Sequence, residues 1–294
     1  MNEIGAANAD TERRATLLCA SWLFVPASRS DRFSKALGSG ADAVVFDLED
    51  AVAPSEKDAS REILRMWDGY DHRSFVRMNS FESIWWEQDL ELMRDIDAVP
   101  VIPKAEDPGW VAEVVRQSRA SRAVVLVESA TGLSKLEDLT AIDGVERVMF
   151  GSVDYATDIG TDPANREALA YARGRLVTGS RAAGLPPPID GPTLDLSHAT
   201  GLIDDSRSAK GLGFAGKVCV HPFQVRHVNR AFSVSGAEID WARTIMGSAP
   251  DEGVSVVAGA MVDAPVLARA RSILRQAEEE MMRKVEGMND DRSS

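Results

Sequence analysis

Cysteine is scarce in this chain of 294 residues, which contains only two of them. Cys19 and Cys219 each fall inside an apolar run of the kind found in strands. Disulfides persist in oxidising compartments, and folds that depend on them are rich in cysteine. We therefore expect two buried thiols in a reducing compartment, and hence a cytoplasmic protein.

Long apolar runs and basic charge are also lacking. No stretch approaches the ~18 apolar residues of a membrane span. The apolar residues 16–25 follow the acidic Asp10 and Glu12, and no small-residue cleavage site comes after them, so we do not expect a signal peptide. The formal net charge of −13 argues against a nucleic-acid partner, which needs a concentrated basic face.

Two ligand-binding patterns are missing as well. The chain has four histidines and neither a CxxC nor an HExxH pattern, which makes zinc a poor candidate. No G-x-G-x-x-G turn follows the first strand-like run. That turn marks the doubly wound sheets that bind dinucleotides, so its absence weighs against such a sheet.

What the chain does contain is a regular alternation of short apolar runs and longer amphipathic stretches, which is typical of βα units. Eight runs are predicted strands: 22–26, 43–47, 75–77, 99–103, 123–127, 147–151, 188–190 and 217–220. Predicted helices between them include 31–37, 56–66, 108–118, 166–183 and 206–212. The pattern predicts an α/β protein with a (β/α)₈ TIM barrel, and an open doubly wound sheet is the alternative.

The alternation ends near residue 230, which predicts three parts: a tail over 1–16, a barrel over 17–230 and a C-terminal helical extension over 231–294. The extension contains a predicted helix near 238–246 and a long one over 264–287. The long helix carries an apolar stripe at helical spacing. The stripe comprises Val266, Leu267, Ala270, Ile273, Leu274 and Ala277. We expect it to pack on the barrel or on a neighbouring subunit.

Polar residues follow nearly every predicted strand. In a parallel barrel these positions converge on one mouth, where such folds carry their active sites. In strand order they are Asp47, Glu49 and Asp50, then Arg77, Lys104, Glu128, Asp154, Asp190 and His221. Carboxylates after three different strands, together with an arginine, predict a charged site in the mouth.

Glu128 and Asp154 form the predicted metal site. Mg²⁺ prefers oxygen ligands and usually takes only one or two protein carboxylates, leaving its other positions to water and substrate. The alternative is that both carboxylates pair with Arg77 or Lys104.

Arg77 is predicted to bind a substrate carboxylate, since a guanidinium can donate two parallel hydrogen bonds to it. The alternative makes Arg77 a buried partner of Asp47 or Glu49. Lys104 lies among carboxylates and is expected to be a charged ammonium, not a Schiff-base nucleophile. For His221 we expect a structural role, with its ring bonded to a backbone carbonyl.

Several longer segments have a familiar order. They are WLFVPASRSDRFSKALGSGADAVVFDLEDAVAPSEKDASR, FVRMNS, VPVIPKAE, LVESATGL, FGSVDYATDIG and the later IDGPTLDLSHATGLIDDSRSAKGLGFAGKVCVHPFQV and GAMVDAP. This order resembles the citrate lyase β-subunit-like family, the acyl-CoA branch of the HpcH/HpaI aldolase and citrate lyase superfamily. The resemblance covers residues 20–270.

The resemblance implies a TIM barrel with a C-terminal helical extension, usually a homotrimer, and Mg²⁺-dependent cleavage or formation of a carbon–carbon bond between a 2-oxo acid and an acetyl thioester. The family's metal ligands fall on Glu128 and Asp154, and its carboxylate-binding arginine on Arg77. The acidic motif that holds metal-bound waters and the reacting centre falls on Asp47, Glu49 and Asp50.

Asp263 lies in the segment that matches the family's G-x-M-[VI]-D-x-P motif. The resemblance implies that Asp263 is the acid/base residue that a neighbouring subunit contributes. The sequence leaves the base open between Asp263 and a carboxylate after the second strand. One departure concerns the substrate: the family usually has Arg-Ser where this chain has Ala20-Ser21, so a possible contact to the acyl thioester is lost.

The expected function is therefore a Mg²⁺-dependent lyase or synthase acting on an acyl-CoA such as citramalyl-CoA or malyl-CoA. The alternatives are a malyl-CoA thioesterase and a citrate lyase β-subunit acting on an acyl-carrier-protein thioester. A binding protein without activity is disfavoured, because a cluster of buried charges is costly to maintain without a use.

Overall fold

The computed structural model describes residues 19–248, 255–257 and 260–290. Its contacts divide the chain into two compact units, one up to Phe232 and one from Ser233 onward. The predicted tail over 1–16 lies outside the described residues.

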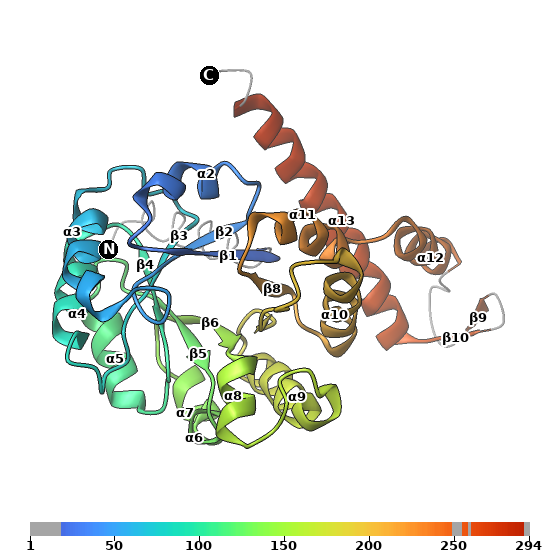
Figure 1. Cartoon of the computed structure of the whole chain (residues 1–294). Helices are drawn as coiled ribbons and strands as arrows, with labels where there is room; N and C mark the ends of the chain where they lie inside the picture. The colour runs from blue at the N-terminus through green and yellow to red at the C-terminus, as the bar shows by residue number, and fades with distance from the viewer. Residues whose placement is uncertain (1–18, 249–254, 258–259, 291–294) are drawn as a thin grey trace, which may run out of the picture. The chain divides into compact units, whose positions relative to one another are not determined.

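The first unit is a closed barrel of eight parallel strands in sequence order, with β1 paired to β8 (Figure 1). The strands are β1 (Ser21–Pro26), β2 (Ala43–Asp47), β3 (Ser74–Arg77), β4 (Val99–Ile102), β5 (Ala123–Val127), β6 (Val145–Phe150), β7 (Ile189–Asp190) and β8 (Gly216–Cys219). All eight predicted strands are present, each within two residues of its predicted bounds. The barrel is confirmed and the open-sheet alternative is wrong.

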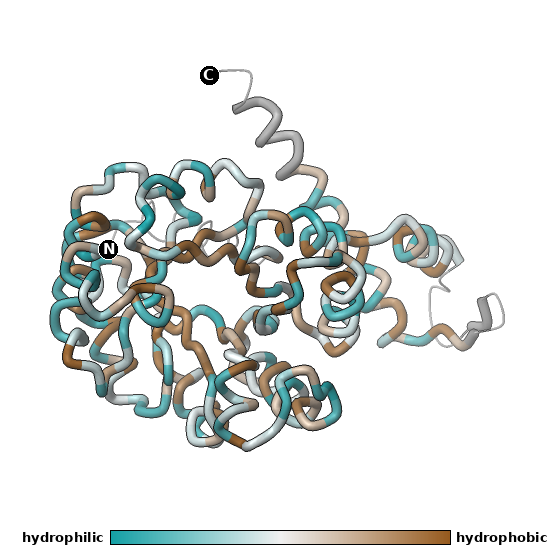
Figure 2. The backbone as a smooth tube through the Cα atoms, viewed as in Figure 1, coloured by the Kyte–Doolittle hydropathy of each residue, from teal (hydrophilic) through white to brown (hydrophobic). Residues whose placement is uncertain are grey.

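Helices follow the strands and surround the barrel (Figure 1). They are η1 (Ser30–Arg32), α2 (Phe33–Leu37), η2 (Pro54–Glu56), α3 (Lys57–Met66), α4 (Trp86–Asp95), α5 (Pro108–Gln117), α6 (Ala130–Ser134), α7 (Leu136–Thr140), α8 (Ser152–Asp158), α9 (Arg166–Ala182), α10 (Ala199–Leu212) and α11 (Pro222–Phe232). Hydrophobic residues run along the strands, and hydrophilic residues alternate with them on the helices (Figure 2).

Two apolar layers stabilise the barrel. The inner layer fills the space enclosed by the strands, where the ring of Trp22 from β1 lies 4.6 Å from that of Phe75 on β3. The outer layer lies between strands and helices and includes Phe33, Phe46 and Leu64. Each strand contributes to both layers because its side chains alternate between its two faces. That alternation also decides which strand-end residues face the barrel interior.

The second unit contains α12 (Gly236–Gly247), the antiparallel strands β9 (Ser255–Val257) and β10 (Ala260–Val262), and the long helix α13 (Ala264–Asp290). A capping box between Ser235 and Glu238 begins α12. Part of the apolar stripe of α13 packs with Ala242 and Ile245 of α12 in a small core. The expected packing of this stripe on the barrel or on a neighbouring subunit remains a prediction.

Both cysteines are buried, as predicted. Burial raises the pKa of the Cys219 thiol to about 12, so this group is a poor nucleophile. Among the helices of the described residues, none has the length and apolarity needed to span a membrane.

Candidate active site

The pleat of the strands brings Asp47, Arg77 and Glu128 to one end of the barrel interior. Within β2, Ala43 and Val45 belong to the inner apolar layer, and Asp47 follows them at the same spacing of two. The same spacing places Arg77 after Phe75 on β3 and Glu128 after Leu126 of β5. The predicted convergence of these three strand ends is therefore confirmed by the register.

Arg77 and Asp47 form a two-pronged ion pair across β2 and β3. The Nε and Nη2 groups of Arg77 donate to Oδ1 and Oδ2 of Asp47 at 2.7 and 2.6 Å. The Nη1 atom of Arg77 lies 3.0 Å from Oε2 of Glu49, and the exposed carboxylate of Asp50 lies 3.7 Å away. Burial by itself lowers the pKa of Arg77, but the charges of Asp47 and Glu49 outweigh it and raise the pKa. Arg77 thus has the buried partners that the alternative interpretation named.

Glu128 is buried, with 4% of its surface exposed. Its Oε1 accepts a hydrogen bond of 2.8 Å from the backbone N–H of Lys104, which has a left-handed backbone with φ of 46°. Gly151 packs directly against it, since a Cβ at that position would lie 2.3 Å from the Cβ of Glu128. Burial and then the negative charge of Glu49 raise the pKa of Glu128 to about 8, and Asp154 adds to the effect. Neither the Arg77 pair nor the Lys104 ammonium pair involves Glu128.

Glu49 is the second buried carboxyl group with a shifted pKa. Burial raises the pKa to about 7, against the attraction of Arg77 and with the repulsion of Asp50 and Asp47. The ammonium of Lys104 is half exposed and lies 3.9 Å from Oε1 of Glu49. A carboxyl group with a pKa near neutrality exchanges a proton readily under ordinary conditions, which is the property of a general acid or base.

Asp154 lies in the first turn of α8, directly after β6, and its side chain is exposed. Its charge contributes to the raised pKa of Glu128, so the two carboxyl groups interact through space. Within the described residues, no three His, Cys, Asp or Glu side chains form a ready-made metal cage. Two carboxylates fit Mg²⁺, which usually keeps several water ligands. A cation there would also offset the repulsion that now opposes ionisation of Glu128.

Lys57 and Asn79 are parts of the site that the sequence did not single out as a unit. The ammonium of Lys57 donates to the backbone carbonyls of Leu48 and Glu49 and to Oδ1 of Asn79. A lysine at the start of a helix is an ordinary surface residue in a sequence. Its acceptors come from two other connections, so only the fold reveals the contact.

His221 differs from its expected role. Its ring is exposed, and Nδ1 accepts a hydrogen bond of 3.1 Å from the backbone N–H of Phe223. The expected bond from the ring to a backbone carbonyl is therefore wrong. The reason is that α11 begins at Pro222, and the first N–H groups of a helix lack backbone partners, so the ring acts as an N-terminal cap.

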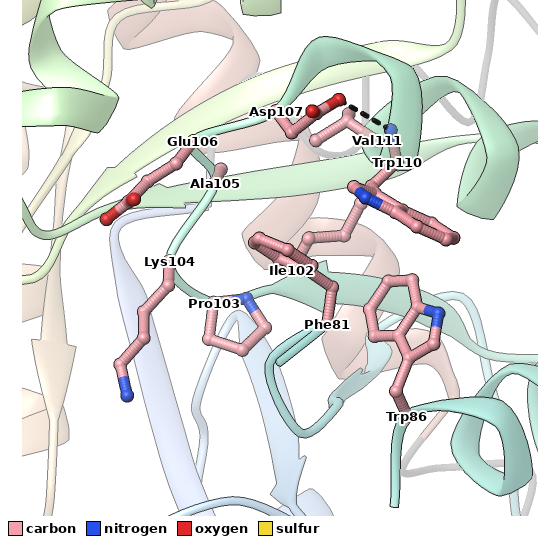
Figure 3. A pocket seen from close by; sticks show the side chains of 10 residues that line it. All are labelled: Phe81, Trp86, Ile102, Pro103, Lys104, Ala105, Glu106, Asp107, Trp110 and Val111. Carbon is pink, nitrogen blue, oxygen red and sulfur yellow. Dashed lines mark hydrogen bonds between the residues drawn. The ribbon is translucent and has the colours of Figure 1, made fainter. Parts of the chain in front are cut away.

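Aromatic rings line a hollow at the same end of the barrel (Figure 3). The ring of Phe81 stacks on that of Trp110 with 6.0 Å between centroids, and Trp86 meets Trp110 edge-on at 6.0 Å. Figure 3 shows the side chains of Lys104 and Glu106 directed away from these rings. We assign the hollow a packing role that supports the segment carrying Lys104.

Asp263 belongs to the second unit, where it precedes α13. Its Oδ1 accepts a hydrogen bond of 3.2 Å from the backbone N–H of Val266, so it caps the helix. Its expected role as acid or base in another subunit remains a prediction.

These features define a (β/α)₈-barrel protein with buried carboxylates and an arginine at the carboxyl ends of its strands. The family model for the HpcH/HpaI aldolase/citrate lyase matches residues 20–222, and one for a C–C bond lyase of the TIM-barrel fold matches residues 181–279. The chain belongs to the HpcH/HpaI aldolase/citrate lyase family, a family of citrate lyase-like enzymes, as its resemblance predicted.

Individual relatives agree with this membership. A citrate lyase subunit beta-like protein of Mycobacterium tuberculosis is 34% identical over 266 residues, covering 88% of this chain and 95% of the relative. A (3S)-malyl-CoA thioesterase of Cereibacter sphaeroides is 31% identical over 272 residues, covering 88% and 94%. The solved structure of CitE from M. tuberculosis in complex with magnesium, acetoacetate and coenzyme A has a TM-score of 0.81 and 32% identity, covering 88% of this chain and 98% of that chain.

Proposed function

We propose that this protein is a Mg²⁺-dependent carbon–carbon lyase that cleaves a 3-hydroxy carboxyacyl-CoA, such as citramalyl-CoA or malyl-CoA, to acetyl-CoA and a 2-oxo acid, or forms it in reverse. The observation that carries the proposal is the buried Glu128, whose ionisation is opposed by Glu49 and Asp154 in the same mouth as Arg77. The relative solved with magnesium and coenzyme A supports the choice of ligands.

Glu128 and Asp154 are the residues that would hold the metal. The chemistry supplied by a bound Mg²⁺ would be Lewis-acid polarisation of the hydroxyl and carboxylate oxygens of the substrate. The backbone N–H of Lys104 keeps the Glu128 carboxylate in place, and Gly151 allows it to lie against the end of β6.

Arg77 would bind the carboxylate of the 2-oxo acid portion. A guanidinium has five N–H donors, and the two hydrogen bonds to Asp47 leave others for a substrate. Asp47 in turn fixes the plane of the guanidinium, so that its orientation is set before the substrate arrives.

Proton transfer to or from the substrate hydroxyl is assigned to Glu49, because its pKa of about 7 suits exchange at neutral pH. Asp263 of a neighbouring subunit is the second candidate, favoured by the motif in which it lies. The proposal therefore includes a homotrimer, and it places the protein in the cytoplasm with neither nucleic acid nor membrane as partner.

The test is an assay of the purified protein with (S)-citramalyl-CoA, (R)-citramalyl-CoA and malyl-CoA that follows 2-oxo acid and free thiol separately. Release of 2-oxo acid without thiol is expected, lost on adding EDTA and in Glu128→Gln. Glu113→Gln is the matched control, because Glu113 is a surface residue paired with Arg116 on α5. Retention of full activity in Glu128→Gln or in EDTA contradicts the proposal.

Hydrolysis of the thioester is the second candidate function, favoured by the relative named (3S)-malyl-CoA thioesterase. Free thiol among the products identifies this reaction. If no CoA ester reacts, the same assay with an acyl-carrier-protein thioester tests the citrate lyase β-subunit alternative. Ala20 stands where the family usually has an arginine that could contact the acyl thioester. We therefore expect that the carrier of the thioester could differ in this protein.

A further inference from the structure

Lys57, the first residue of α3, is a fully satisfied buried ammonium group behind the candidate active site. Only 4% of its surface is exposed. Its Nζ lies 2.6 Å from the carbonyl oxygen of Leu48, 2.7 Å from that of Glu49 and 2.6 Å from Oδ1 of Asn79. The ring of Trp85 covers it, with its centroid 5.1 Å from Nζ. An ammonium group has three donors, and all three are used.

Two of these acceptors belong to the segment that carries the acidic residues. The carbonyls of Leu48 and Glu49 belong to consecutive peptide planes, so the ammonium holds the plane on each side of Glu49. The same segment is held from its other side by hydrogen bonds from the N–H of Leu48 to the carbonyl of Arg77 and from the N–H of Glu49 to Oδ1 of Asp47, both 2.9 Å. The backbone position of Glu49 is thus set jointly by Lys57 and by the pair of Asp47 and Arg77.

The third acceptor ties the ammonium to a second buried group. Asn79, after β3, donates from its backbone N–H and its Nδ2 to Oδ2 of Asp89, each at 2.7 Å. The other carboxylate oxygen of Asp89 accepts from Arg61, one turn after Lys57 on α3. The ammonium is therefore held in place by α3, by the segment after β3 and by α4. No donor of Lys57 remains to contact a substrate.

We propose that Lys57 is a positioning residue for the reaction, which acts by holding the carboxyl group of Glu49 at its place beside Arg77. The inference rests on the proposed function, in which Glu49 transfers a proton. Without Lys57, the buried carbonyl of Leu48 loses the ammonium, and that of Glu49 keeps only the longer hydrogen bond of 3.2 Å from the N–H of Val52, so the segment is less firmly held. A displacement of about 1 Å at a reacting group can reduce a rate by roughly 10²-fold.

The experiment compares Lys57→Met with Lys217→Met in the full-length protein. Lys217 is the matched control because it is equally buried and donates to Oδ2 of Asp190 and to the carbonyl of Gly191, on a different part of the barrel. Both variants are measured for kcat and KM, for urea unfolding and for hydrogen–deuterium exchange of the amides at residues 48–52. Asn79→Ala, which removes one acceptor and keeps the ammonium, is a milder third variant.

For Lys57→Met we expect kcat to fall by roughly 10²-fold. KM should be nearly unchanged, since Arg77 is still present to bind the carboxylate of the substrate. Exchange at residues 48–52 rises in Lys57→Met and to a smaller extent in Asn79→Ala, and it stays at the wild-type rate in Lys217→Met. Wild-type kcat in Lys57→Met overturns the inference, and so does an equal loss of kcat in Lys217→Met. If Lys57→Met does not fold, wild-type kcat and exchange in Asn79→Ala overturn it.

A different result contradicts the proposed function: the wild-type protein cleaves no thioester substrate, with or without Mg²⁺. In that case the exchange measurement still decides the structural part. Faster exchange at residues 48–52 in Lys57→Met alone supports the positioning of the segment, and unchanged exchange refutes it.

Discussion

Glu128 lies in an environment that opposes its own ionisation. The ordinary pKa of a glutamate is 4.5, and burial followed by the charges of Glu49 and Asp154 raises that of Glu128 to about 8. The attraction of Arg77 and the hydrogen bond from the backbone N–H of Lys104 act in the other direction but do not offset this rise. A carboxyl group that is protonated at neutral pH is a poor metal ligand, so metal binding and deprotonation must occur together.

The first prediction follows from this coupling. Because Mg²⁺ competes with a proton for Glu128, its affinity should fall as the pH drops below about 8, by up to about tenfold per unit. Isothermal titration with Mg²⁺ at pH 6, 7 and 8, in buffers of different ionisation enthalpy, measures both the affinity and the proton released. Glu128→Gln should bind weakly and without this pH dependence. An affinity that does not change between pH 6 and 8 in the wild type refutes the prediction.

The second prediction concerns the stability of the metal-free protein. The folded state holds a proton on Glu128 more tightly than the unfolded chain does. The contribution of Glu128 to the free energy of unfolding is therefore fully present below pH 4.5, and it is lost as the pH rises to about 8. In EDTA at pH 8, the wild-type protein should have a lower midpoint of thermal unfolding than Glu128→Gln. Mg²⁺ should raise the wild-type midpoint more at pH 8 than at pH 6. An equal rise at both pH values contradicts this.

The third prediction concerns the backbone conformation of Lys104. Its φ of 46° is a left-handed conformation that strains a side chain with a Cβ but suits glycine. Lys104→Gly and Lys104→Ala both lose the ammonium near Glu49 and both keep the backbone N–H that holds Glu128. In urea unfolding, Lys104→Gly should therefore be more stable than Lys104→Ala by about 1 kcal/mol, with equal activity. The reverse order of stability excludes strain at this position.

At the scale of elements, the strands were predictable because each is buried on both faces and forms a continuous apolar run between turns. The polar residues Asp47, Arg77 and Glu128 were predictable because each stands at the end of such a run or directly after it. The start of α10 was not predictable. Residues 199–205 contain a glycine and two aspartates, which favour a loop, but Leu202 and Ser206 are buried in the fold and extend the helix forward.

The contacts of Lys57 were hidden for a different reason. Its acceptors lie in the segment after β2 and in the segment after β3, and a sequence does not show which carbonyls such segments present. The opposite holds for Asp263, whose cap is evident from an Asp directly before a helix pattern. Helix caps and strand ends can thus be predicted from neighbouring residues in the sequence. Contacts between two loops that are distant in sequence can be recognised only in the folded structure.

Asp263 carries the fourth prediction. Asparagine accepts the same hydrogen bond from Val266, so Asp263→Asn should keep the cap of α13, while Asp263→Ala should lose about 1 kcal/mol of stability. If Asp263 also transfers a proton, both variants lose activity to the same extent. Urea unfolding and kcat measured side by side separate these two roles. Full activity in Asp263→Asn removes the acid/base role and leaves only the cap.

At the scale of the whole molecule, the resemblance to the family implies that a second copy of the chain contributes Asp263 to the barrel that carries Glu128, Arg77 and Glu49. If Asp263 acts across a trimer interface, a subunit with Glu128→Gln still donates its Asp263 to the intact barrel of a neighbour. A cyclic trimer has head-to-tail interfaces, so each barrel receives the residue of one neighbour only. Mixed trimers can therefore contain complete sites although neither variant is active alone.

The fifth prediction uses this complementation. Glu128→Gln and Asp263→Asn are refolded together or co-expressed in equal amounts, and we expect about a quarter of the sites, and of the wild-type activity, to be restored. Light scattering coupled to size-exclusion chromatography measures the assembly state of the same sample. Mixing the two proteins without subunit exchange is the control and should give no activity. A trimer that regains nothing after exchange shows that no barrel receives Asp263 from a neighbour. If Asp263→Asn alone also keeps full activity, the base is Glu49.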